Sequence, residues 1–87
     1  MQVKADSIWF QDLSLFSHWQ KLKNEDSPEL NAFEIKQLDS RNAWAFTKSL
    51  PVKIISFDAA TNRVNVEMEI GRMKGSIWWL DASALMK

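Results

Sequence analysis

The chain has 87 residues, and its 11 lysine and arginine residues balance 11 aspartate and glutamate residues, so the formal net charge is zero. This length fits one domain with a single small core, and the balanced charge disfavours a protein that coats nucleic acid. The absence of cysteine excludes disulfides, thiolate metal sites and a thiol nucleophile, and two glycines are too few for a phosphate-binding loop.

The N-terminal residues carry no positively charged segment followed by a long apolar run, so a signal peptide is not expected. The longest purely apolar run, Ile77–Leu80, is far shorter than the roughly 20 residues of a membrane-spanning helix. We therefore expect a cytoplasmic protein with no membrane partner. The lack of cysteine is compatible with a reducing compartment.

Residues 12–23 predict an amphipathic helix. Leu15, Trp19 and Leu22 recur at spacings of four and three residues, which places them on one helix face. Asp12 is suited to cap the N-terminus, because its carboxylate can accept a free N–H of the first turn. Two lysines in the last turn suit the negative end of the helix dipole.

After this helix the chain predicts strands separated by turn signals. A polar loop over residues 24–29 contains Ser27 and Pro28, which resemble a helix start and leave a short helical turn open. From Ala32, however, apolar and charged residues alternate with a period of two, which is typical of a half-buried strand. Glycines bound a hairpin loop at 71–75. The predicted strands span about 32–38, 43–47, 52–57, 63–70 and 76–80, and a helical turn capped by Asp81 closes the chain.

The strand faces indicate how the sheet is covered. Val64, Val66 and Met68 alternate with polar residues, so that strand buries one face. By contrast, Ile54–Ile55 and Ile77–Leu80 place apolar groups on both faces, which must be covered or used for contact. We therefore predict a single α+β domain over residues 1–87, in which the N-terminal helix packs on a curled, about five-stranded antiparallel sheet or small barrel.

From Val52 onward the predicted order is strand, loop, strand and hairpin, and it closes with Gly75-Ser76-Ile77-Trp78-Trp79-Leu80 and the turn at 81–85. This order is similar to that of SH3-like small barrels, over about half of the chain. The resemblance implies a barrel. It does not imply the proline-rich ligand of peptide-binding SH3 domains, since the chain has no tyrosine with which to hold one.

Enzymatic chemistry finds little support in the residues. The one histidine, His18, lies on the predicted helix beside Trp19, and no serine stands in a nucleophile-elbow context. Glu67 and Glu69 share one side of a strand, where solvated carboxylates are common. With one imidazole and no thiolate, a metal site is also not expected. We predict no catalytic residues, no metal and no cofactor.

Five tryptophans are many for this length. Most are expected to fill the core, but the adjacent Trp78 and Trp79 cannot share one face of a strand, so one of them is a candidate for a contact surface. We predict a protein–protein interaction module, such as a bacterial or phage adaptor, accessory subunit or inhibitor. The predicted contact residues are Trp44, Phe46, Trp78, Trp79, Arg72 and Lys74.

Besides a domain that binds a small molecule in an aromatic pocket, two alternatives remain open at this point. A small barrel can bind single-stranded RNA or DNA by stacking bases on aromatic rings beside a basic groove. The candidate basic residues are Lys48, Lys53, Arg63, Arg72 and Lys74. Pairing at a sheet edge, with another protein or with a second copy to form a homodimer, is a further contact geometry.

Overall fold

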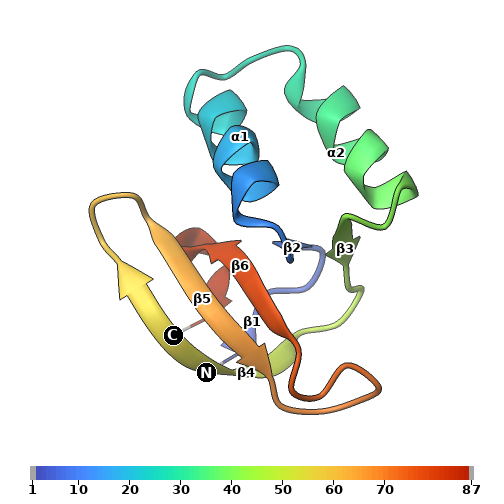
Figure 1. Ribbon diagram of the computed structural model, residues 1–87, viewed down its shortest axis with the longest axis vertical. Coiled ribbons are helices and arrows are strands. Elements are labelled where there is room, and N and C mark those ends of the chain that lie inside the picture. Colours follow the sequence, from blue (N-terminus) through green and yellow to red (C-terminus); the bar gives the residue numbers. More distant parts are fainter. Residues whose placement is uncertain (1, 87) are drawn as a thin grey trace.

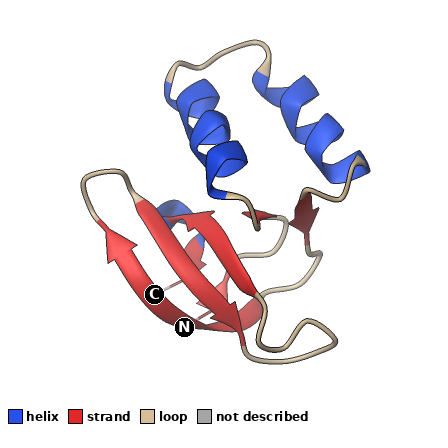
Figure 2. Ribbon diagram, in the orientation of Figure 1, coloured by secondary structure: helices blue, strands red, loops and turns tan. Residues whose placement is uncertain are grey.

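The structure is a computed structural model that describes residues 2–86, and it has an α+β fold (Figure 1). Two helices lie beside a curled antiparallel sheet whose strands follow the order β3-β2-β6-β5-β4-β1-β7 (Figure 2). The expected combination of a helix with a curled antiparallel sheet is therefore confirmed, although a second helix and further short strands are present. In chain order the elements are β1 (Gln2–Val3), β2 (Ile8–Phe10), α1 (Leu13–Asn24), α2 (Leu30–Asp39), β3 (Ala43–Ala45), β4 (Leu50–Asp58), β5 (Arg63–Met68), β6 (Ile77–Asp81), the 3₁₀ helix η1 (Ala82–Ala84) and β7 (Leu85–Met86).

Helix α1 begins directly after Asp12, whose carboxylate accepts a hydrogen bond from the N–H of Leu15 at 3.1 Å. This bond caps the first turn as the sequence predicts. Phe16, Trp19 and Leu22 are buried on the face toward the rest of the protein. The apolar spacing in the sequence therefore located this helix to within one residue at each end.

Helix α2 stands where the sequence predicted a strand over residues 32–38, so that prediction is wrong. Phe33 and Leu38 lie three and eight residues after Leu30, and all three pack against the buried residues under the helices. Ile35 created the apparent period of two, but it is 51% exposed and contributes little to the core. The helical spacing of these partly buried residues is thus the pattern that the fold uses.

The meander β4–β5–β6 forms the centre of the sheet, and the N-terminal segment pairs on both of its sides. Strand β2 pairs with β3 and β6, whereas β1 pairs with β4 and β7. The sequence predicted neither β1 nor β2, because two or three residues are too few to show a period. Strands β3 to β6 lie at 43–45, 50–58, 63–68 and 77–81, close to the predicted ranges, whereas the two-residue β7 was not predicted.

The sheet has an apolar layer on each side. We call the concave side of the curled sheet, which carries the larger layer, the inner face. The opposite side, on which the helices pack over β2, β3 and β6, is the outer face. Residues opposite each other in an antiparallel ladder share a face, so Val66 and Trp78 lie on the inner face and Asn65 and Trp79 on the outer face. The inner core consists of Val3, Trp9, Val52, Val64, Val66, Met68, Trp78 and Leu80. The outer core consists of Phe10, Phe16, Trp19 and Ala43.

Candidate functional site

Trp78 lies in the inner core and has no exposed surface. Its ring meets those of Trp9, Phe46 and Trp44 edge-to-face, with centroid distances of 5.8, 6.3 and 6.5 Å, the geometry that aromatic quadrupoles favour. Its indole N–H donates to the hydroxyl of Ser76 at 2.7 Å. Of the predicted contact residues, Trp78 therefore serves the core, and Trp44 and Phe46 are half-buried by packing against it.

Trp79 is the surface member of the tryptophan pair. It lies opposite Asn65 on the outer face and is half-buried where it packs against the outer core. The guanidinium carbon of Arg63 lies 5.9 Å from its ring centroid, within the range of a cation–π contact. These two side chains line an open depression of about 240 Å³ together with Ser56, Phe57 and Asp58.

Arg72 and Lys74 lie on the exposed loop between β5 and β6, as the sequence predicted. Gly71 and Gly75 bound this loop with φ angles of 81° and 89°, which glycine adopts at little cost. Between the two cations, Met73 turns inward and packs against the inner core. The loop is therefore anchored at its centre, and it presents its two charges to solvent.

The basic residues do not gather into one groove. Arg63 is the first residue of β5, and Arg72 and Lys74 follow its last residue. A six-residue strand spans about 20 Å, so this distance separates the cations at its two ends. Lys53 lies directly opposite Glu67 on the neighbouring strand. Arg63 is therefore separated from the cations of the loop, and Lys53 has an acidic neighbour, which disfavours the single-stranded nucleic acid alternative.

The second half of β4 exposes apolar side chains and has a strand on only one side. Ile54, Ile55 and Phe57 are 37, 48 and 58% exposed. In the described residues 2–86, β1 pairs only with the first two residues of β4, so Lys53–Asp58 pairs with β5 alone. We call the unpaired backbone of these six residues the free edge. In the sequence, the adjacent Ile54 and Ile55 indicated a strand with apolar residues on both faces, and hence a candidate contact surface.

A polar cluster around Asp81 joins four parts of the chain. One carboxylate oxygen accepts from the side-chain amide of Asn62 at 2.9 Å and from the N–H and hydroxyl of Ser83 at 2.9 and 2.7 Å. The other accepts from the amide of Gln20 at 3.3 Å and lies 3.6 Å from the ammonium of Lys23. The predicted capping role of Asp81 is therefore present, and the same carboxylate also holds α1 to β6.

Burial by itself would raise the pKa of Asp81, because it disfavours the charged carboxylate. The hydrogen bonds from Ser83 and Gln20 and the charge of Lys23 act in the opposite direction and outweigh burial, so the pKa lies below its ordinary value. Asp81 is thus an ionised structural group, not a candidate proton donor.

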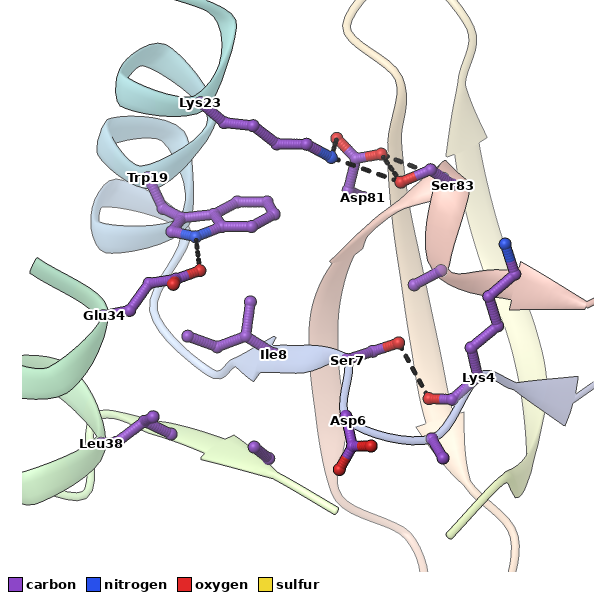
Figure 3. Close-up of a pocket in the computed structure, with 13 residues that line it drawn as sticks. Lys4, Asp6, Ser7, Ile8, Trp19, Lys23, Glu34, Leu38, Asp81 and Ser83 are labelled. Atoms are coloured by element: carbon purple, nitrogen blue, oxygen red, sulfur yellow. Dashed lines mark hydrogen bonds and ion pairs between the residues drawn. The ribbon is translucent and has the colours of Figure 1, made fainter. Parts of the chain in front are cut away.

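A cavity of about 340 Å³ lies beside this cluster, between the helices and the link from β1 to β2 (Figure 3). The indole N–H of Trp19 donates to the carboxylate of Glu34 at 2.7 Å, and the ammonium of Lys23 lies 5.2 Å from the centroid of the Trp19 ring. The hydroxyl of Ser7 donates to the carbonyl of Lys4 at 2.8 Å. The side chains of Trp19, Glu34, Lys23 and Ser7 thus have partners within the protein, and the cavity, which Lys4 and Asp6 also line, lies at a junction between elements.

His18 is exposed, and its ring lies 4.8 Å from that of Phe33 on α2, so it forms part of the contact between the helices. Among residues 2–86, no group of three histidine, aspartate or glutamate side chains is placed to hold a metal ion. None of the helices in this described part of the chain has the length and apolar character needed to cross a membrane.

Comparisons of this chain with protein-family models, with curated proteins and with solved structures found no match. The function is therefore inferred from the residues and their geometry alone.

Proposed function

We propose that this protein is a small interaction module that binds another protein through the outer face of β4, β5 and β6. The observation that carries this proposal is the depression where the half-buried Trp79 lies beneath Arg63. Tryptophan and arginine are the residue types most enriched among those that dominate binding energy at protein interfaces. A partner side chain that enters this depression would contact both.

The surface extends along β6 from this depression. Ile77 lies two residues before Trp79 on the same face and is 41% exposed. The loop with Arg72 and Lys74 directly precedes β6. Glu67, opposite Ile77, adds a negative charge to the same face. An apolar centre with charges of both signs around it suits a protein partner better than a phosphate backbone.

The proposed mechanism is binding without catalysis. An apolar side chain of the partner fills the depression at Trp79, and Arg63 and the two cations of the loop set the orientation of the complex. The protein would act in the cytoplasm as an adaptor, an accessory subunit or an inhibitor. Trp44 and Phe46 contribute indirectly, because they pack against Trp78 and so support β6 from its inner face.

Affinity capture from a lysate of the source organism tests this proposal. The tagged protein should retain a stoichiometric protein after nuclease treatment. Ile77→Lys and Arg63→Ala should each weaken this capture about tenfold or more, because they alter the proposed contact centre. Ile35→Lys makes the same apolar-to-lysine change at an exposed position on α2, and it should leave capture unchanged. Capture that disappears with nuclease would indicate the single-stranded nucleic acid alternative instead.

A further inference from the structure

The free edge of β4 supports an inference beyond the proposed function. We propose that two copies of this chain pair there in antiparallel orientation, so that one sheet runs through both copies. An unpaired strand edge presents N–H and C=O groups that can bond to another strand, and proteins usually cover such edges or protect them with proline or charge. Residues 53–58 contain no proline and expose three large apolar side chains, and their two charges, on Lys53 and Asp58, are of opposite sign.

A β-bulge in β4 fixes which residues share a face. Ile54 lies opposite Val66, and Ser56 lies opposite the next residue of β5, Asn65. Ile55 and Ser56 therefore occupy a single position of the ladder. After the bulge Phe57 lies opposite Val64, so Ile54 and Phe57 both lie on the inner face, one position on either side of the bulge.

A two-fold axis through this bulge pairs residues at equal distances from it. Ile54 then lies opposite Phe57 of the second copy, and both are inner-face residues. One position further out, Lys53 lies opposite Asp58 of the second copy, and both are outer-face residues. Each apolar residue thus meets an apolar residue, and each ammonium meets a carboxylate. The symmetry produces every pair twice.

Other registers match less well. Residues opposite each other in an antiparallel ladder share a face, so the register can shift only in steps of two positions. Such a shift would reduce the ladder from five positions to three and would leave the partners of Lys53 or Asp58 outside it. The register centred on the bulge therefore combines the longest pairing with complementary charge.

The two helices lie away from the free edge. The helices pack on β2, β3 and β6, and Figure 1 shows the yellow end of β4 at the outer margin of the sheet, away from α1 and α2. Lys53 forms no ion pair within residues 2–86. Asp58 accepts the N–H of Ala60 with one oxygen, at 3.0 Å, which leaves the other oxygen for an ammonium group.

Charge reversal tests the pairing and its register together. In sedimentation equilibrium, the unaltered chain should form dimers. Lys53→Asp and Asp58→Lys should each weaken dimerisation about tenfold or more, because each places like charges opposite each other twice. An equal mixture of these two variants should recover dimers, since every pair between the copies again joins a carboxylate to an ammonium. The chain that carries both reversals should pair with itself.

Phe57→Lys provides a test that does not depend on the charged pair, and it should also give monomers. The matched control Ile35→Lys should remain dimeric, and so should Ile77→Lys, which separates this inference from the proposed partner surface. The inference is overturned if the unaltered chain stays monomeric up to about 1 mM. It is also overturned if the single reversals dimerise as tightly as the unaltered chain, or if their mixture recovers nothing.

Discussion

The side-chain amide of Gln20 donates to the carboxylate of Asp81 at 3.3 Å, across 61 positions of the chain. The same amide nitrogen lies 3.1 and 3.3 Å from the carbonyl oxygens of Thr61 and Asn62. One buried amide on α1 therefore contacts both the turn after β4 and the end of β6. The position of the helix over the outer face thus depends on polar contacts as well as on apolar packing.

Asp81→Asn should destabilise the fold by about 2–3 kcal/mol, because it removes the charge that several donors share and brings an N–H group toward them. Chemical denaturation would measure the loss. Asp39→Asn changes an exposed aspartate at the end of α2 and should alter stability by less than about 0.5 kcal/mol. Equal effects of the two substitutions would contradict the role given to the Asp81 cluster.

The lowered pKa of Asp81 predicts a loss of stability in acid. A carboxyl group whose pKa is lower in the folded state binds protons more readily when unfolded. The ionised carboxylate therefore contributes fully to the free energy of unfolding above about pH 3.9, the pKa of an aspartate in the unfolded chain. This contribution disappears as the pH falls through the lower pKa of the folded state. The difference in unfolding free energy between the unaltered chain and Asp81→Asn should shrink between about pH 5 and pH 2. A constant difference across this range would contradict the prediction.

Arg41→Gly should stabilise the protein by about 0.5–1 kcal/mol. Arg41 follows α2 with a φ of 60°, a left-handed conformation that strains side chains other than glycine. The N–H of Arg41 donates to the carbonyl of Leu38 at 3.2 Å, and the N–H of Asn42 donates to the carbonyl of Gln37 at 2.9 Å. These backbone hydrogen bonds keep Arg41 in the left-handed conformation. Thermal unfolding would measure the gain. Asp39→Gly, inside the helix, should have the opposite sign.

Trp78→Ala should cost about 3–5 kcal/mol, because it opens a cavity in the inner core. Trp79→Ala should cost at least about 1 kcal/mol less, since part of this side chain is already exposed. Urea unfolding of the two variants makes the comparison. A loss for Trp79→Ala as large as that for Trp78→Ala would show that Trp79 serves the core, and would remove the main support for the proposed contact surface.

The sequence predicted correctly those elements in which the spacing of apolar residues matches the spacing of the residues that are buried in the structure. Helix α1 has a capping residue and a regular apolar face, and β5 alternates strictly between buried and less buried residues. For α2 two patterns competed, and the exposed Ile35 favoured the wrong one. The resemblance of Ser27 and Pro28 to a helix start was the better guide, since the hydroxyl of Ser27 accepts the N–H of Glu29 at 3.1 Å just before α2.

The candidate site was predictable only in part. The sequence showed that Trp78 and Trp79 must face opposite sides, but the choice between them depends on register with Asn65 and Val66, which no local pattern contains. The same register brings Arg63 to Trp79. The free edge of β4 depends on the shortness of β1, a strand of two residues that sequence periodicity cannot reveal.

The placement of β1 constrains the order of folding. Gln2 and Val3 pair with Leu50–Pro51 and with β7, so both pairings join parts of the chain that lie far apart in the sequence. The local hairpins β4–β5 and β5–β6 can close early, because their loops are short. The pairing of β1 with β4 and β7 closes much longer loops, so we expect it to form later. We therefore expect amide hydrogen exchange to protect the central meander first and β1 last during refolding.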